Sequence, residues 1–325
     1  MGKRPAISCG LIALALVASN LATSCGTGMP ARSPAKIASL ASARRTVALG
    51  VNASDAPSVE PVQAFAQLAG RRPQVVMWYQ NWSEPLFYKS QIRALSTQGF
   101  IPMINWHPIG SPRSRYALRA IANGALDAYI RASARRAASW AHPMFVDFAQ
   151  EMNIGGYPSS PHVDGNAPAL YVRAWRHVVL IFRAEGADNV HWVWAPNTDC
   201  EGRCPFTEFY PGNAWVNWVG LDGYSFAGVD GSPWRLFQQI FGPSYRILTS
   251  LTNKPVMIAE TASTELGGSK AQWILNMRDS LLKDLPRVRL LVWFDRVKET
   301  NWLINSSPSS LAAFRTVMRR PPFVG

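Results

Sequence analysis

The chain has 325 residues, of which 48% are hydrophobic and only 16% are charged, and its formal net charge is +13. This balance excludes a disordered chain, because disordered chains combine low hydrophobicity with high charge. The positive charge favours anionic partners, but the basic residues are scattered, with no long basic run and no zinc-finger spacing. We therefore expect a generally basic surface and no nucleic-acid partner.

Residues 1–25 have the pattern of an export signal. Lys3 and Arg4 give a positive start, a short apolar run follows, and small residues close the segment. The apolar run is about half of the ~20 residues that a membrane-spanning helix needs. We expect an exported protein, either extracellular or anchored at the cell envelope.

Cys25, at the end of this signal, has the position of the acylated cysteine of bacterial lipoproteins, although Ala22 stands where a leucine is usual. Lipid anchoring through Cys25, with membrane attachment, and simple cleavage with release are both open. Residues 26–45 are rich in Ser, Ala, Gly and Pro, which predicts a flexible tether.

Two further cysteines, Cys200 and Cys204, lie close together in DCEGRCPF. An exported chain meets oxidising conditions, which favours a small disulfide loop between them. The alternative is a two-cysteine metal site, but no second cysteine pair or histidine-rich segment lies nearby. We predict the disulfide and no metal.

Eight apolar runs follow the tether at intervals of roughly 34 residues, a length that fits a strand, a helix and two loops. Each run is rich in Val, Ile, Phe and Trp and is almost continuously apolar, as expected for strands buried on both faces. The runs are Thr46–Ala53, Gln74–Trp82, Gly99–His107, Pro143–Asn153, Asn189–Asn197, Asn217–Ser225, Lys254–Ser263 and Arg287–Asp295.

Amphipathic segments such as 117–138 and 170–185 separate most of these runs. The alternation predicts a single α/β domain, a (β/α)8 TIM barrel, over residues 46–325. A doubly wound sheet is the alternative, but it usually carries a glycine-rich nucleotide loop, and neither G-x-G-x-x-G nor a Walker loop is present. We therefore expect no cofactor.

Polar and aromatic residues gather at the carboxyl end of nearly every run. In a parallel barrel these ends share one rim, and the active sites of such barrels lie there. The candidates for substrate binding at this rim are Trp82, His107, Asn153, Tyr157, Trp194, Asn197, Asp222, Tyr224 and Trp293. The 13 tryptophans of the chain either stack against sugar rings at this rim or fill the core.

Two glutamates end apolar runs, Glu151 on the fourth and Glu260 on the seventh. Because side chains alternate along a strand, we expect Glu151 to share a face with Ala149, and Glu260 to share one with Ile258. If those faces point inward, two carboxylates meet across the barrel mouth, as glycosidic cleavage requires. The alternative is that each glutamate pairs with an arginine at the rim.

These residues resemble glycoside hydrolase family 26, whose acid/base segment reads His-Glu-Met-Asn-Gly-x-Trp-Tyr-Pro. Residues 150–158, QEMNIGGYP, line up with it, and residues 192–197 (WVWAPN) and 219–224 (VGLDGY) resemble later motifs. The Trp-His pair at residues 106–107 and the seventh run also match. The resemblance covers about residues 46–318.

The resemblance implies the role of each main residue. Glu151 would be the acid/base and Glu260 the nucleophile of a retaining mechanism. Tyr224 would hydrogen-bond the nucleophile, and Trp293 would form a platform under the sugar. The substrate would be a β-linked polysaccharide, a β-mannan or a β-glucan, cleaved by a monomeric enzyme.

Two departures from the family pattern bear on this interpretation. Gln150 replaces the histidine before the acid/base, and Gly156 replaces a tryptophan that would stack on a sugar. An alternative is therefore a catalytically silent barrel that binds polysaccharide at the cell surface. A third possibility is binding of anionic wall polymers through the basic surface.

Overall fold

A computed structural model describes residues 35–43, 45–110, 117–161, 163–198, 202, 204–229 and 231–323. All of these residues belong to one compact unit, Ser33–Gly325. The predicted export signal and Cys25 lie outside the described residues, and so does Cys200. The signal, the lipid anchor and the Cys200–Cys204 disulfide therefore stay predictions.

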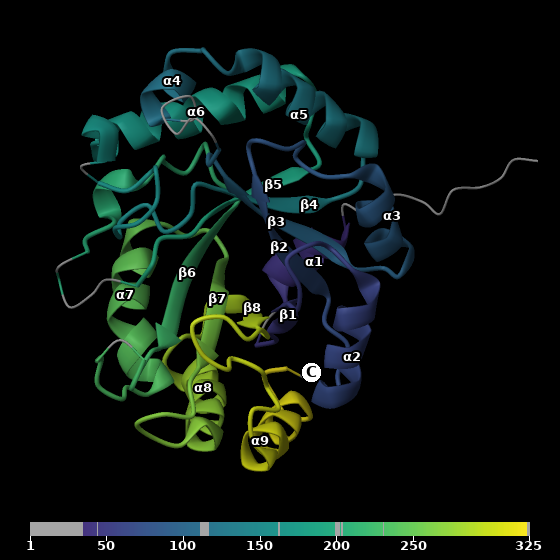
Figure 1. The fold of residues 1–325 in the computed structure, drawn as a ribbon, viewed down its shortest axis with the longest axis vertical. Coiled ribbons are helices and arrows are strands. Elements are labelled where there is room, and N and C mark those ends of the chain that lie inside the picture. Colours follow the sequence, from purple (N-terminus) through teal and green to yellow (C-terminus); the bar gives the residue numbers. More distant parts are fainter. Residues whose placement is uncertain are drawn as a thin grey trace, which may run out of the picture. The chain divides into compact units, whose positions relative to one another are not determined.

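Eight parallel strands form a closed barrel in which each strand pairs with the next and β8 pairs with β1, as Figure 1 shows. Every one of the eight apolar runs contains one strand, so the predicted (β/α)8 barrel is confirmed. The strands are β1 (Ala48–Asn52), β2 (Val75–Asn81), β3 (Ile101–His107), β4 (Met144–Phe148), β5 (Val190–Trp194), β6 (Trp218–Ser225), β7 (Val256–Ser263) and β8 (Val288–Phe294).

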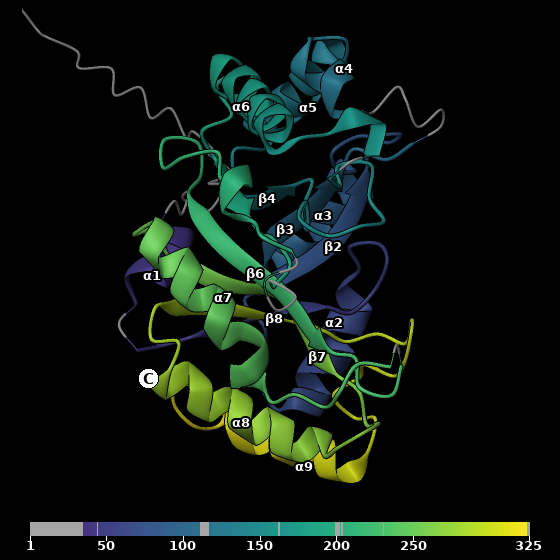
Figure 2. The same ribbon diagram turned by 90° about the vertical axis from the view of Figure 1, so that its left-hand side faces the viewer.

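All the helices but the first, which lies at one end of the barrel, surround it on its outside (Figures 1 and 2). They are α1 (Ala35–Ser42), α2 (Val59–Ala69), α3 (Lys89–Thr97), α4 (Leu118–Ala122), α5 (Asp127–Trp140), α6 (Pro168–Ala184), α7 (Phe237–Leu251), α8 (Lys270–Lys283) and α9 (Pro308–Met318). The predicted amphipathic segment 117–138 is divided between α4 and α5, where Gly124 has a left-handed backbone with φ of 83°. No helix in the described part of the chain has the length and hydrophobicity needed to cross a membrane.

The strands bury two separate apolar layers, because alternate side chains point to opposite faces. The outer layer lies between strands and helices and holds most of the large aromatic residues, among them Trp78, Trp106 and Trp175. The inner layer fills the barrel, with residues such as Met77, Met103 and Met257. The tryptophans packed in the outer layer account for much of the unusual tryptophan content.

Helix α1 closes the end of the barrel where the strands begin (Figure 2). Its Ile37 and Leu40 are buried and pack in the inner layer with Ala48 and Leu290, which lie at the starts of β1 and β8. The prediction of a flexible tether over residues 26–45 is therefore corrected for Ala35–Ser42. The segment consists mostly of small residues, so the helical spacing of its two larger apolar side chains was overlooked. Those two side chains lie one helical turn apart and form the buried face of the helix.

Candidate active site

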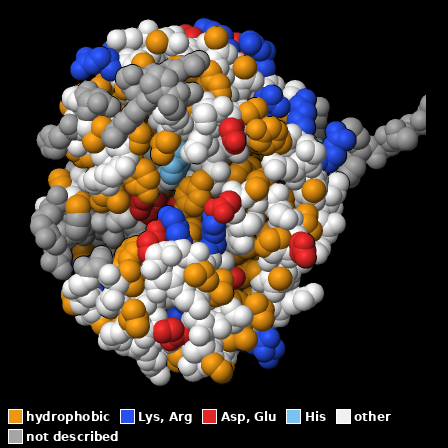
Figure 3. Space-filling view, in the orientation of Figure 1, with side chains coloured by type: hydrophobic (Ala, Val, Ile, Leu, Met, Phe, Trp, Pro, Cys, Tyr) orange, Lys and Arg blue, Asp and Glu red, His pale blue; other side chains and the backbone are white. Residues whose placement is uncertain are grey.

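A pocket of about 200 Å³ lies at the carboxyl ends of the strands. Figure 3 shows a hollow on this face where acidic, basic and histidine side chains gather. Both predicted glutamates line this one pocket. Its lining residues are Tyr79, Glu151, Ile154, Tyr157, Asn197, Tyr224, Phe226, Glu260, Phe294, Lys298, Glu299 and Trp302.

Glu260 points into the barrel because β7 contains one extra residue. Leu221 of β6 pairs with Ile258, but the next residue, Asp222, pairs with Glu260, so Ala259 has no partner on β6. The register with β8 shifts over the same residues. Such a bulge re-aims the side chains that follow it.

This bulge corrects the predicted face of Glu260. Ile258 packs in the outer layer and Ala259 in the inner layer, so simple alternation would turn Glu260 towards the helices. The glutamate instead bonds to inward-facing residues of three other strands. The prediction of an inward carboxylate was right, but the reason given for it was wrong.

Three hydrogen bonds hold the Glu260 carboxylate. Tyr79 Oη and Tyr224 Oη donate to Oε2 at 2.6 and 2.7 Å, and Asn105 Nδ2 donates to Oε1 at 2.6 Å. The contact from Tyr224 is the one that the family resemblance implies. Burial and the charge of Glu151 raise the pKa of Glu260 to about 7, while the bonds from both tyrosines favour its charged form and lower that pKa.

Glu151 lies beyond the end of β4 on a strained backbone. Its φ is 53°, and Ala149 has a φ of 51°, so two non-glycine residues are left-handed within three positions. The predicted shared strand face therefore does not exist, because Ala149 packs in the outer layer while Glu151 opens into the pocket. The amide of Glu151 donates to Ala195 O at 2.9 Å, which ties this turn to β5.

Two donors orient the Glu151 side chain. Tyr157 Oη donates to Oε2 at 2.7 Å, and Asn197 Nδ2 donates to Oε1 at 2.5 Å. Burial raises the pKa of Glu151. Neither glutamate has an arginine partner among the described residues, so the alternative of rim ion pairs finds no support there.

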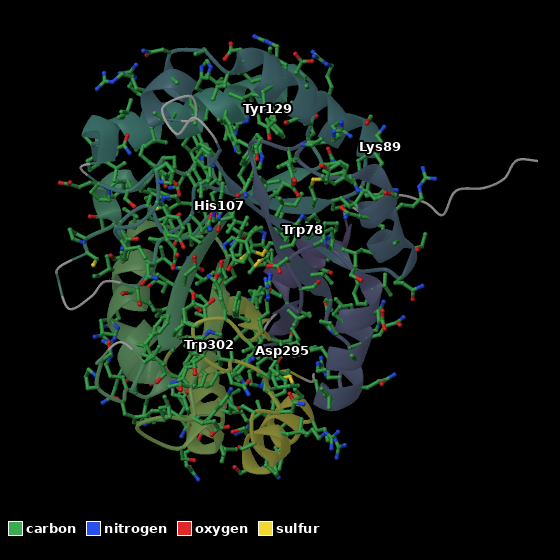
Figure 4. The ribbon with its side chains drawn as sticks, viewed as in Figure 1. Trp78, Lys89, His107, Tyr129, Asp295 and Trp302 are labelled. Carbon is green, nitrogen blue, oxygen red and sulfur yellow. The ribbon has the colours of Figure 1, made fainter. Side chains whose placement is uncertain are left out.

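His107 lies behind the pocket, between the residues that hold the two glutamates. Its ring packs edge-on against Tyr79 and Tyr157, with centroids 5.4 and 5.6 Å away. Burial lowers the pKa of His107 to about 4, so the ring is neutral and Nε2 can accept the hydrogen bond from Gln150 Nε2. Figure 4 shows His107 near the centre of this face. Gln150 thus supports the site through His107.

Asp222 and Asn153 lie close to the site without lining the pocket. Asp222 is fully buried, and this burial raises its pKa well above the ordinary value. The charges of Glu260 and Glu151 raise the same pKa by smaller amounts. Asn153 Nδ2 donates to the carbonyls of Asn197 and Cys204 at 2.9 and 2.8 Å. Asn153 therefore fixes the loop that carries Asn197, and its place is a structural one.

The three tryptophans predicted to contact substrate lie elsewhere. Trp82, Trp194 and Trp293 are at most 1% exposed and pack in the outer layer. Trp293 Nε1 donates to Trp302 O at 3.1 Å. The expected sugar platform at Trp293 is corrected, because side chains that face the helices cannot reach the pocket.

Several residues of the site are absent from the predicted candidates. Tyr79, which lines the pocket, and Asn105, which bonds to Glu260 beside it, sit at inward positions of β2 and β3, so their strand positions carried a signal. Phe294 is the inward neighbour of Trp293 on β8 and lines the pocket. Lys298, Glu299 and Trp302 come from the segment after β8, which has no regular alternation of apolar and polar residues (Figure 4 labels Trp302).

Buried polar contacts fix the segment after β8 over the pocket. Lys270 of α8 is fully buried, and its Nζ donates to Leu303 O at 2.8 Å and to Asn301 O at 3.4 Å. Asp295 Oδ1 accepts from Ile304 N at 2.7 Å. The main chain that presents Trp302 is therefore held at three points.

Comparison with known proteins gives matches in sequence. The model described as Glycosyl hydrolase family 26 matches residues 159–279, a range that includes Glu260. Endoglucanase H of Acetivibrio thermocellus is 37% identical over 265 residues, which make up 80% of this chain. The aligned part spans 29% of the length of that relative.

Solved structures show the same fold at low sequence identity. A modular endo-β-1,4-mannanase from Cellulomonas fimi aligns over 88% of this chain and 73% of its own, with a TM-score of 0.68 and 18% identity. The catalytic domain of a Bacillus sp. JAMB-750 endo-β-1,4-mannanase aligns over 86% and 87%, with a TM-score of 0.64 and 17% identity. The resemblance inferred from the motifs is confirmed.

Proposed function

We propose that this chain, which is similar to glycoside hydrolase family 26, is a retaining glycoside hydrolase that cleaves a β-linked polysaccharide. The observation that carries the proposal is the pair of buried glutamates that line one small pocket. Each carboxylate is held by its own set of donors, and both line the same pocket. Two carboxylates arranged in this way can act on a single bound sugar.

In the proposed mechanism Glu260 is the nucleophile. Three donors stabilise its charged form, whereas Glu151 has two. Glu151 is the protonated partner and gives its proton to the leaving glycosidic oxygen, while Glu260 attacks the anomeric carbon. Water, deprotonated by Glu151, releases the sugar from Glu260 in the second step.

The substrate in this proposal is a β-mannan or a β-glucan. The relative at 37% identity is called an endoglucanase, and the similar structures at lower identity are called mannanases. Residues 154–157 contain no tryptophan, and the partly exposed aromatic side chains that line the pocket, among them Tyr224 and Phe226, offer the aromatic surface instead. On the strength of the signal pattern in the sequence, we place the enzyme outside the cell or on its envelope. We further propose that it is a monomer.

The test is hydrolysis of mannan, mixed-linkage β-glucan and xylan by the wild type and by Glu260→Ala. The release of reducing sugars measures the rate, and NMR identifies the anomer that forms first. We expect cleavage of one of the first two glycans with retained configuration, and none by the variant. Inverted products would reject the nucleophile role. Binding of a glycan without any hydrolysis would instead establish the silent barrel.

A further inference from the structure

A group of exposed basic side chains lies at the end of the barrel opposite the catalytic pocket. In a closed parallel barrel every strand begins at the same end, so the segments that precede the strands meet there. Helix α9 follows β8 and ends on this side, where α1 also lies (Figure 2). We call five exposed residues from the segments before β1, β2 and β8 and after α9 the basic face: Arg45, Arg72, Lys283, Arg319 and Arg320.

Contacts between these four segments make them neighbours on the surface. The amide of Val47, just before β1, donates to Pro322 O, just after α9, at 2.8 Å. Arg315 Nε of α9 donates to Leu68 O, near the end of α2, at 2.7 Å. Strand β8 pairs with β1, and β1 pairs with β2. The basic face is therefore built around the start of β1.

The basic face has little acidic charge to balance it. Asp284 is the one acidic residue that the sequence has in these four segments. Glu185 and Asp188 also lie at this end, but they precede β5, on the opposite side of the barrel from β1. No acidic side chain of the described residues forms an ion pair with a member of the basic face. Its positive charge is therefore available to a partner.

Helix dipoles explain only part of this charge. A basic residue is favoured in the last turn of a helix, where the carbonyl ends carry partial negative charge. Lys283 lies in the last turn of α8, and Arg319 lies directly after α9. Arg45, Arg72 and Arg320 lie outside helices. Clustered like charges repel one another, and an anionic partner would offset that repulsion.

Apolar side chains among these basic residues favour a lipid surface over a soluble polyanion. Leu282 is 37% exposed beside Lys283, and Pro321 is exposed beside Arg320. At a membrane surface basic groups meet the lipid phosphates, and apolar groups enter the boundary between headgroups and acyl chains. A soluble polyanion has no such apolar layer.

The first described helix begins at the same end of the barrel. Helix α1 starts at Ala35, and Cys25 is ten residues earlier in the sequence. Ten fully extended residues span at most about 35 Å. A lipid on Cys25, one of the two alternatives that the sequence leaves open, would therefore keep this end of the barrel close to a membrane.

We infer that the basic face docks on an anionic phospholipid membrane, so that the catalytic pocket opens away from the membrane. The inference does not depend on the proposed function, because it concerns the opposite end of the barrel. An anionic wall polymer is the other partner that suits positive charge, and the test separates the two.

The test is cosedimentation of the protein with lipid vesicles. Every sample is the full-length chain with Cys25→Ser, so that no lipid can be attached to it. One set of vesicles is phosphatidylcholine alone, and the other contains phosphatidylcholine and phosphatidylglycerol in equal parts. The difference in binding between the two sets measures recognition of the anionic headgroup.

Two triple variants separate the basic face from the overall charge of the protein. The first removes three exposed charges of the basic face: Arg45→Gln, Arg319→Gln and Arg320→Gln. The matched control has the same net charge and removes three exposed charges from the helices that follow β2 and β3: Lys89→Gln, Arg93→Gln and Arg119→Gln.

We expect stronger binding to the anionic vesicles than to phosphatidylcholine, and binding that weakens as salt is added. The face variant should lose on the order of tenfold or more in its partition coefficient, and the control should stay within about twofold. Replacing the same three arginines with lysine keeps the charge and should keep the binding. Equal losses in the two glutamine variants, or equal binding to both kinds of vesicle, would overturn the inference.

A soluble polyanion tests the other partner. Sodium polyphosphate carries phosphate charge without an apolar layer. If it binds the protein through the basic face while the anionic vesicles show no advantage over phosphatidylcholine, the membrane is rejected in favour of a wall polymer. A loss of vesicle binding confined to the face variant also establishes the orientation, because the pocket lies at the other end of the barrel.

Discussion

The two ends of the barrel differ in chemistry although the same eight strands form both. At the end where the strands begin, aliphatic side chains meet Ile37 and Leu40 of α1 and exclude water. At the other end, four carboxylic acids, Asp147, Glu151, Asp222 and Glu260, are each at most 8% exposed. Burial of apolar side chains at one end stabilises the fold, whereas burial of acidic groups at the other end costs stability and provides the carboxyl groups of the site.

Removing a glutamate from the open end should have the largest effect. Glu260→Ala should lower kcat by on the order of 10⁴ on every substrate, because no other group can attack the anomeric carbon. Glu151→Ala should lose polysaccharide cleavage to a similar degree but keep much more activity on a nitrophenyl β-oligoside, whose leaving group needs no proton.

Steady-state kinetics on both substrates separates these two roles. Glu60→Ala on the exposed surface of α2 is the control and should stay within about twofold of wild type. Equal losses for the two glutamate variants on the nitrophenyl substrate would contradict the assignment of Glu151.

A tryptophan near the open end should behave as part of the core. Trp82 is 1% exposed and packs against Trp106, Tyr129 and Phe148. Trp82→Ala should therefore cost about 3–5 kcal/mol in the free energy of unfolding and leave KM unchanged, as measured by denaturant titration and by kinetics on folded protein. A raised KM with unchanged stability would return Trp82 to the substrate site.

The closed end is tested by Ile37→Ala. Loss of this buried side chain from α1 should lower the free energy of unfolding by about 2–4 kcal/mol without changing kcat/KM. Ala38→Ser, on the exposed side of the same helix, should change stability by less than about 0.5 kcal/mol. Unchanged stability in Ile37→Ala would mean that α1 does not close the barrel in solution.

The buried charge of Glu260 should itself lower stability above its pKa. Because burial raises the folded-state pKa from 4.5 to about 7, stability is highest at low pH and falls as pH rises through that window. Glu260→Gln removes the charge, so it should raise the Tm at pH 8 by about 2–4 °C for each kcal/mol gained, with little change at pH 4. An equal Tm shift at both pH values would contradict this linkage.

The smallest predicted effect concerns the tyrosines around Glu260. Tyr79→Phe removes a donor to the charged form, so the pKa of Glu260 should rise and the acidic limb of the kcat/KM profile should move to higher pH by about one unit. Tyr224→Phe should shift the limb in the same direction. A pH profile that moves down or stays fixed in both variants would show that Glu260 does not set this limb.

The sequence predicted the fold because the fold depends on repeated patterns. Eight apolar runs with regular spacing require buried parallel strands, and the polar residues at their ends identify the rim. The boundary at α1 was missed because only two buried residues, Ile37 and Leu40, distinguish that helix from a tether. Two apolar residues are too few to predict a helix from the sequence. Their role becomes clear only once the structure shows the end of the barrel that they cover.

The site was predicted less completely because side-chain direction depends on local backbone geometry. Glu151, Glu260, Tyr157, Asn197 and Tyr224 all line the pocket as candidates. The tryptophans failed because residues that are neighbours on a strand face opposite sides, so Phe294 reaches the pocket while Trp293 does not. Lys298 and Trp302 come from an irregular segment, whose path depends on buried bonds to Lys270 and Asp295 that no local pattern encodes.

The unpaired Ala259 also makes the backbone path of β7 a condition for catalysis. If β7 ran through Ala259 with regular alternation, the carboxylate now bonded to Tyr79 would face the helices instead of the sugar. A barrel that lacked this bulge but kept the alanine would hold all of its chemical groups and still be inert. The pairing of β6 with β7, and not the presence of the glutamate alone, therefore decides whether the nucleophile reaches its substrate.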